Sequence, residues 1–219
     1  MNKFDQPKSN PLLKNYVNSL GLVDYDIIRK DDWFWKQITC IEKINIKNLT
    51  RDEQLAFWLN TYNILTIKGV LQELDRNYKW KGNISLLTKF RFFILRKHLV
   101  ARKNISLNLI EHKILRKKFS DPRIHFAINC GSISCPYLPN KLIESNSLDK
   151  TLDGLTSFFI NSGNVVRNNQ NKILVISKIF KWYKENFKGF GGVRKFINNY
   201  LKVKIQYIEN YSIKYEKYE

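Results

Sequence analysis

One stretch, from Arg51 to about residue 73, constrains the fold more than any other part of the chain. Thr50-Arg-Asp-Glu53 is a capping box, in which the Thr50 hydroxyl and the Glu53 carboxylate satisfy free backbone N–H groups at a helix start. Apolar side chains then cover nearly the whole circumference of a helix about 30 Å long. Because a helix that is apolar on all sides is buried, we expect the other elements to pack around it.

Two asparagines interrupt this apolar helix. Asn60 and Asn63 lie about one turn apart and share a face. Buried amides need hydrogen-bond partners, at a cost of about 1–3 kcal/mol each when they have none. The two side chains either pin a neighbouring segment to the helix or orient a catalytic or ligand-binding group. We expect both to be buried and hydrogen-bonded to residues 125–135.

The segment 123–136 concentrates side chains that can carry chemistry. Asp121-Pro122 breaks the chain before it, and the next seven residues alternate and are largely apolar, which predicts a short buried strand ending in a turn at Gly131. Along a strand, residues i and i+2 share a face, so His125 and Asn129 would point the same way. The bland alternative is a buried cysteine and a satisfied core histidine. The candidate site residues of this segment are His125, Asn129, Cys130, Ser132 and Cys135.

The remaining patterns predict an α+β fold. Expected helices cover residues 32–44, 109–117 after an Asn108 cap, 147–161, 177–188 and 193–201. Expected strands cover residues 90–101, 105–107, 165–166, 173–176 and 204–208. We therefore expect a single α+β domain over residues 23–216, with a small, mostly antiparallel sheet packed by several helices. Residues 1–22 should form a loosely attached N-terminal arm. The helix 109–117 should bring Glu111 or His112 towards the 125–135 segment.

The composition limits the classes of function. The 219 residues carry a formal charge of +19, so this is a basic protein, and that charge invites contact with nucleic acid or an anionic membrane. The basic residues are spread along the chain, however, and no base-reading motif is present. We therefore expect no sequence-specific nucleic-acid partner.

Location and redox state are constrained less tightly. No stretch reaches the roughly 18 apolar residues that a transmembrane helix needs, so no integral membrane segment is expected. The first twenty residues lack an apolar leader, which favours a cytoplasmic protein, while an exported form with a removed leader stays open. The chain has 3 cysteines, an odd number that argues against a disulfide scaffold. Cys130 and Cys135 are nevertheless close enough to pair in an oxidising compartment.

Four runs of sequence together resemble a known family. They are Ala56–Asn63, Leu109–Arg116, Asp121–Pro136 and Ile179–Phe187. In their order and content the chain resembles a domain-of-unknown-function family, number five-four-seven, over about residues 23–216. The resemblance implies a domain found in bacteria and plants, often fused in plants to glutaredoxin, DEP or leucine-zipper segments. It implies no established activity.

Two departures from the family pattern bear on catalysis. Tyr137 stands where relatives tend to have a second proline after Cys-Pro. Near the end, relatives usually show Tyr-Asp-Trp-Ser-Leu-Asn, where this chain has the run Glu209–Lys214. If that aspartate orients a catalytic histidine in relatives, Asn210 replaces it here and Glu209 could shift into its place. The departure weakens the assignment of a catalytic triad.

Three classes of function follow. The first is a binding or interaction module, in which the His/Asn/Cys cluster around residues 125–135 serves an unknown small-molecule, peptide or protein partner without a cofactor. The second is a thiol-dependent hydrolase or acyltransferase, with Cys130 or Cys135 as nucleophile and His125 as base. Its orienting or oxyanion-stabilising amides would be Asn60, Asn63 and Asn129.

The third class is a metal site, and its spacings argue against it. The available ligands are His98, His112, His125, Glu111, Cys130 and Cys135. Their spacing fits no recognised zinc signature. We therefore expect no metal.

Overall fold

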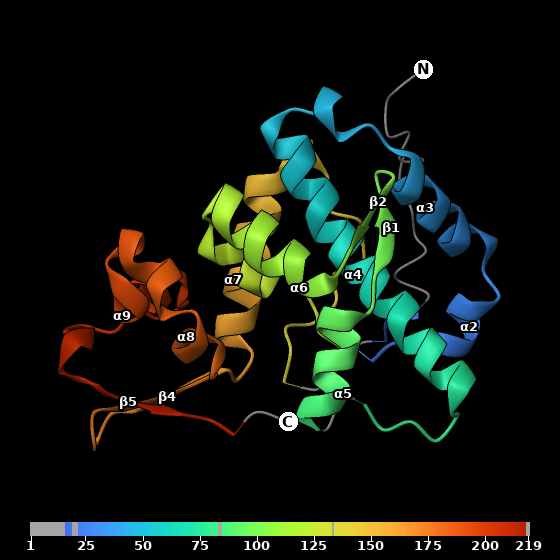
Figure 1. Ribbon diagram of the computed structural model, residues 1–219. Coiled ribbons are helices and arrows are strands. Elements are labelled where there is room, and N and C mark those ends of the chain that lie inside the picture. Colours follow the sequence, from blue (N-terminus) through green and yellow to red (C-terminus); the bar gives the residue numbers. More distant parts are fainter. Residues whose placement is uncertain (1–15, 19–21, 83–84, 133, 218–219) are drawn as a thin grey trace.

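Helix α4, Arg51–Arg76, crosses the middle of the molecule (Figure 1). The computed structural model describes residues 16–18, 22–82, 85–132 and 134–217. Thr50 and Glu53 form the predicted capping box at the start of α4. Every residue from Leu55 to Ile67 is buried, so the apolar circumference does predict a central helix.

The elements before and after α4 cover one side of it. They are α2 (Tyr25–Arg29), α3 (Asp32–Lys43), the 3₁₀ helix η1 (Ile46–Asn48) and the antiparallel hairpin of β1 (His98–Val100) and β2 (Lys103–Ile105). Helix α3 lies where the sequence predicts it, capped by the Asp31 carboxylate. The hairpin lies beside α3 (Figure 1), and the Ala101 N–H donates to the Ile41 carbonyl at 2.9 Å.

The strand predicted for residues 90–101 is wrong over most of its length. Helix α5 (Leu86–Phe90) runs directly into the π-helix η2 (Arg91–Leu95), and only β1 is extended. The local reason is a capping box at Ser85 and Thr88, which exchange side-chain and backbone hydrogen bonds and start a helix. An apolar run of this length is compatible with a strand or a helix, and the capping box favours the helix.

The strand predicted for residues 123–129 is also wrong. Residues Pro122–Phe126 form the 3₁₀ helix η4, because Pro122 supplies a helical φ and the Asp121 carboxylate caps the turn by accepting from the Arg123 N–H. Before it come α6 (Leu107–Leu109) and the π-helix η3 (Ile110–Phe119). Their N-terminal cap is Ser106, whose Oγ accepts from the Leu109 N–H, and not the predicted Asn108.

The last third of the chain follows the predicted order with two corrections, one of which is that the helix predicted for 177–188 is divided into a short α-helix and a 3₁₀ helix. Its elements are η5 (Ser145–Ser147), α7 (Leu148–Asn161), β3 (Val165–Asn168), β4 (Ile173–Ile176), α8 (Ile179–Trp182), η6 (Lys184–Phe190), α9 (Gly192–Tyr200), η7 (Ile208–Asn210) and β5 (Ser212–Tyr215). The predicted strand 204–208 is irregular instead. Its buried residues, Ile205 and Ile208, are three apart, which does not match the period of two in a strand.

The sheets are small, and one pairing departs from the antiparallel pattern. Strands β3 and β4 form the predicted hairpin, while β5 pairs with β4 in parallel. The fold is thus α+β and mostly antiparallel, with most of its mass in helices. No helix in the described part of the chain is long and apolar enough to cross a bilayer.

Two apolar clusters form the interior. The larger surrounds α4 and includes Tyr16, although most of the predicted N-terminal arm lies outside the described residues. The smaller is aromatic and joins α7, α8, η6 and α9, with Phe126 of η4 inserted among their phenylalanines. Helix η4 therefore lies at the seam between the two clusters, and this position places the candidate site.

Candidate functional site

His125 of η4 lies at this seam, with 3% of its surface exposed. Its ring stacks on Tyr183 at 3.9 Å between centroids and an interplanar angle of 14°. Its Nε2 lies 3.2 Å from the Asn186 Oδ1. Tyr183 lies between α8 and η6 and Asn186 lies within η6, about 60 residues further along the chain, so a tertiary contact creates this arrangement.

The surroundings keep this histidine neutral. Burial is the largest cause that lowers the pKa of His125 to about 3; electrostatic interactions with Arg116 and His112 act in the same direction, and the bond to Asn186 opposes them only in part. Because the Asn186 Oδ1 is an acceptor, the Nε2 carries the proton in this arrangement. Nδ1 is then the ring atom with a lone pair available as a base or an acceptor.

Glu111 connects the π-helix η3 to the same place. One carboxylate oxygen accepts from the Tyr183 hydroxyl at 2.6 Å and the other from the Tyr62 hydroxyl of α4 at 3.1 Å. Glu111 is thus linked to His125 through the stacked Tyr183. The predicted approach of Glu111 or His112 to the 125–135 segment itself stays a prediction. π-Helical turns occur often at functional sites, and η3 supplies three side chains to this one.

Arg116 and His112 complete the group. The Arg116 guanidinium lies over the Tyr183 ring at 4.7 Å and donates from Nε to the Asn186 Oδ1 at 3.2 Å. Its other end lies 2.7 Å from the His112 Nδ1, which must accept because a guanidinium only donates. The proton of His112 then sits on Nε2. We call Glu111, His112, Arg116, His125, Tyr183 and Asn186 the His125 cluster; all except His125 are partly exposed.

The two asparagines of α4 divide between two segments. Asn63 donates to the Ala127 carbonyl and accepts from the Asn129 N–H, both at 2.9 Å, as predicted. The prediction for Asn60 is wrong, because its amide makes the same pair of bonds with the backbone of Ile143. Both side chains are buried, and each satisfies one backbone carbonyl and one backbone N–H of a segment distant in sequence. Their role here is to pin the chain to α4.

The two cysteines of the predicted site form a disulfide, Cys130–Cys135. The Asn129 side chain closes the same short loop by donating to the Pro136 carbonyl at 2.8 Å and accepting from the Gly131 N–H at 2.7 Å. Gly131 has a φ of +77°, which a glycine adopts without strain. Ser132 is half-buried in this loop, and its carbonyl accepts from the Cys135 N–H. A nucleophilic role for either cysteine stays a prediction that applies to the reduced protein.

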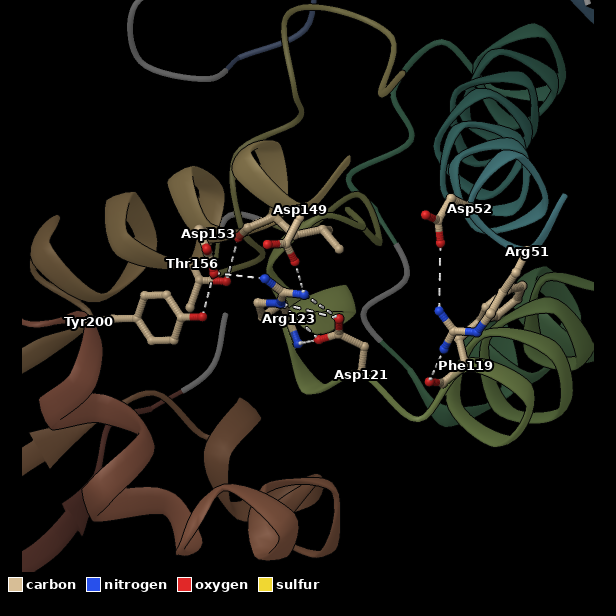
Figure 2. A network of polar contacts seen from close by, with 10 residues as sticks. Arg51, Asp52, Phe119, Asp121, Arg123, Asp149, Asp153, Thr156 and Tyr200 are labelled. Atoms are coloured by element: carbon tan, nitrogen blue, oxygen red, sulfur yellow. Dashed lines mark hydrogen bonds and ion pairs between the residues drawn. The ribbon is translucent and has the colours of Figure 1, made fainter. Parts of the chain in front are cut away.

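A network around Arg123 holds η4 in place (Figure 2). The guanidinium bonds Asp121 and Asp153 at 2.8 Å and pairs with Asp149 at 2.7 Å. Tyr200 of α9 donates to the Asp153 carboxylate at 2.6 Å. Burial disfavours the charge on Arg123, but the bonds to Asp121 and Asp153 outweigh it and raise the pKa above its usual value. Since Arg123 is two residues before His125, this network fixes the approach of His125 to η6.

His98 lies apart from the His125 cluster. It is buried in β1, and burial, followed by the charges of Lys68 and Arg96, lowers the pKa of this histidine to about 4. Its Nε2 has no hydrogen-bond partner among the described residues. No three His, Cys, Asp or Glu side chains of the described chain are arranged to hold a metal ion.

Sequence reasoning missed four of the residues that matter here. Arg116, Tyr183 and Asn186 lie inside runs already singled out, Leu109–Arg116 and Ile179–Phe187, but nothing in the chain order brings those runs together. Arg123 was noted only as the start of the 123–136 segment. The sequence feature that could have indicated these residues is that charged and aromatic side chains recur in all of these runs.

Two hollows of the surface lie elsewhere. One, of about 830 Å³, is lined by Tyr16, Val23, Tyr25, Leu74 and Tyr78 among others. The second, of about 950 Å³, lies between Tyr137, Leu138, Leu142, Leu155 and Phe158. Neither includes a residue of the His125 cluster, so that cluster is a partly exposed polar patch and not the wall of either hollow.

Comparison with known families gives one match. The model described as "Protein of unknown function, DUF547" matches residues 46–160. The matched region includes α4, η3 and η4, and ends near the end of α7. No curated protein and no solved structure matches this chain.

Proposed function

Since the chain belongs to the DUF547 family of proteins of unknown function, we propose that it is a binding module whose ligand docks at the His125 cluster. One observation supports the proposal most strongly: side chains from three separate sequence runs meet in one partly exposed group. Five of the six members keep some contact with solvent. Burial of charged groups is costly, so a cluster that only stabilised the core would not be expected to combine a carboxylate, a guanidinium and a partly exposed imidazole.

The charges suggest the chemistry of the ligand. The two oxygens of Glu111 already accept from tyrosine hydroxyls, so they offer little to an incoming donor. Arg116 is a fixed cationic fork, and His112 presents its Nε2–H beside it. Lys113 and Lys117 are exposed on the same π-helix. This combination favours a ligand with a carboxylate or phosphate group.

The test is a binding experiment on paired arginine variants. Carboxylates and phosphate monoesters would be screened by NMR against the imidazole signals of His112 and His125, with inorganic phosphate as the first probe. Arg116→Gln should weaken binding of any hit at least about tenfold, the effect of losing one charge-assisted hydrogen bond. Arg167→Gln, an exposed arginine on β3, is the matched control and should bind as the wild type does. Equal affinity in both variants would contradict the proposal.

A thiol-dependent hydrolase or acyltransferase is the alternative, supported by the partial exposure of Cys130. It requires the Cys130–Cys135 bridge to open, since only a thiolate is nucleophilic. Ester and amide substrates would be screened with and without reductant, using Cys130→Ser and Cys135→Ser. Activity that appears on reduction and disappears in one variant supports the enzyme, whereas activity that survives in both excludes these cysteines as nucleophiles.

A further inference from the structure

The helical segment Leu86–Leu95 exposes an apolar face that no described part of the chain covers. It consists of α5 and the π-helix η2, which continue one another. Leu86 and Leu87 are 87% and 75% exposed, and Leu95 is 56% exposed. Phe90 and Ile94 are also exposed. Side chains of this size gain by leaving water, so a contiguous exposed set of them marks a surface that binds something.

The spacing gathers these side chains on one side of the helix. Leu86, Phe90 and Ile94 are successive fourth residues, which share a face, and Leu87 lies next to that stripe. Phe92 points the other way and is buried against the core, where it stacks on Trp80. Phe93 is partly buried against the same core, so the segment is anchored by Phe92 and Phe93 and presents its leucines outward. We call Leu86, Leu87, Phe90, Ile94 and Leu95 the exposed apolar face.

The charge around this face has one sign. No Asp or Glu occurs between Asp75 and Glu111. The same interval carries the basic residues Arg76, Lys79, Lys81, Lys89, Arg91, Arg96, Lys97, Arg102 and Lys103. The nearby Glu73 is buried and already paired with Arg91 and Arg96. Lys79, Lys81, Lys89 and Lys97 are exposed, and these lysines lie within or near the exposed segment in sequence, with no Asp or Glu of the same interval to offset their charge.

We propose that the exposed apolar face docks on an anionic lipid surface, with the leucines and Phe90 among the acyl chains and the lysines among the headgroups. A bilayer rich in anionic lipid offers both chemistries in this geometry, an apolar layer directly beneath a negatively charged one. A second copy of the chain fits poorly, because a symmetric contact would bring two sets of these lysines together on chains that each carry +19. Nucleic acid offers the charge but no apolar layer for the leucines. The proposal concerns elements other than the His125 cluster and does not depend on the proposed function.

The experiment separates insertion from simple attraction between charges. Sedimentation with vesicles of phosphatidylcholine alone, or with about one third phosphatidylserine, gives the partition coefficient. The wild type should bind the anionic vesicles and not the neutral ones. Leu86→Ser with Leu87→Ser should lower partitioning at least about tenfold, because burial of a leucine contributes strongly to interfacial binding. Val203→Ser, which changes another exposed apolar residue, is the matched control and should partition as the wild type does.

A second readout reports depth directly. Leu87→Trp should be quenched by lipids brominated on their acyl chains more strongly than the wild type, whose 5 tryptophans set the background, because an indole reaches the bromines only when it enters the apolar layer. Each of three results overturns the proposal: no binding to anionic vesicles, equal binding of the double-serine variant, or an unquenched Trp at position 87. A concentration-dependent dimer that the double-serine variant loses would assign the face to a second copy instead. Both leucines are exposed, so the serine variants should retain the fold, which circular dichroism checks.

Discussion

At the scale of single residues, a few buried polar side chains make contacts that the apolar pattern of the sequence does not predict. Asn63 holds two backbone groups, and His125 is kept neutral between Tyr183 and Asn186. Each side chain is buried and hydrogen-bonded, so its removal leaves partners unsatisfied. Measured effects at these positions should therefore exceed those of ordinary polar substitutions.

Asn63→Ala should lower the free energy of unfolding by about 2 kcal/mol, because the Ala127 carbonyl and the Asn129 N–H both lose their partner inside the protein. Asn140→Ala, at an exposed asparagine, should change it by less than about 0.5 kcal/mol. Urea unfolding followed by circular dichroism measures both. A difference between the two variants within experimental error would show that the bonds of Asn63 do not hold the segment to α4.

Acid should destabilise the protein through its buried histidines. The pKa of His125 is about 3 and that of His98 about 4 in the folded state, against about 6.5 in the unfolded chain. As the pH falls below about 6.5, both histidines bind protons in the unfolded chain but stay unprotonated in the folded protein. The free energy of unfolding then falls by about 1.4 kcal/mol per pH unit for each histidine, until the folded pKa is reached.

His125→Gln tests this assignment. Urea unfolding between pH 7 and pH 5 should show a slope reduced by one histidine's share, about 1.4 kcal/mol per pH unit, relative to the wild type. Asn140→Ala, which removes an exposed side chain without a titrating group, should leave the slope close to that of the wild type. An unchanged slope in the His125 variant would mean that this ring is protonated in the folded protein.

At the scale of elements, the Arg123 network decides where η4 lies. It connects η4 to α7 through Asp149 and Asp153, and to α9 through Tyr200 (Figure 2). Only some of these contacts are shielded from water. The Arg123 and Asp121 side chains are each 15% exposed, whereas Asp149 is 83% exposed. The ion pair of Arg123 with the shielded Asp121 should therefore contribute more to stability than its pair with the exposed Asp149.

Arg123→Gln should lower the free energy of unfolding by about 3 kcal/mol, since it leaves the shielded Asp121 carboxylate without its cation. Asp149→Asn should cost less than about 0.5 kcal/mol, because an exposed ion pair contributes little. Thermal and urea unfolding provide the comparison, with Arg167→Gln as the control for loss of an arginine. Equal costs for the two network variants would contradict the burial argument.

At the scale of the whole molecule, the charge of +19 should produce weak and unspecific attraction to polyanions. Binding to DNA of any sequence should weaken by orders of magnitude as salt rises from about 0.05 to about 0.2 M, because contacts with phosphates release counterions. Fluorescence anisotropy with several unrelated duplexes and single strands measures this. A preference of about a thousandfold for one sequence at physiological salt would instead establish specific recognition.

Local signals determined much of the fold. The capping box and the apolar circumference of α4 identify a buried central helix, because both depend on neighbours within a few residues. The hairpin of β3 and β4 and the helix α3 follow from their own spacing in the same way. The burial of Asn60 and Asn63 also follows from the sequence, since apolar residues adjoin both of them on all sides of that part of the helix.

Only the tertiary structure decided the rest. The chain that follows η4 needs no sheet partner, because Asn63 bonds the Ala127 carbonyl and the Asn129 N–H. Asn60 bonds Ile143 instead of the 125–135 segment, because the path of each segment past α4 is determined by tertiary packing and not by nearby sequence. Phe126 packs into the smaller apolar cluster, which the C-terminal elements form. This packing places the neighbouring His125 beside Asn186, which Arg116 also contacts. Local patterns fix which residues are buried, but the partner of a buried polar group depends on the path of the whole chain.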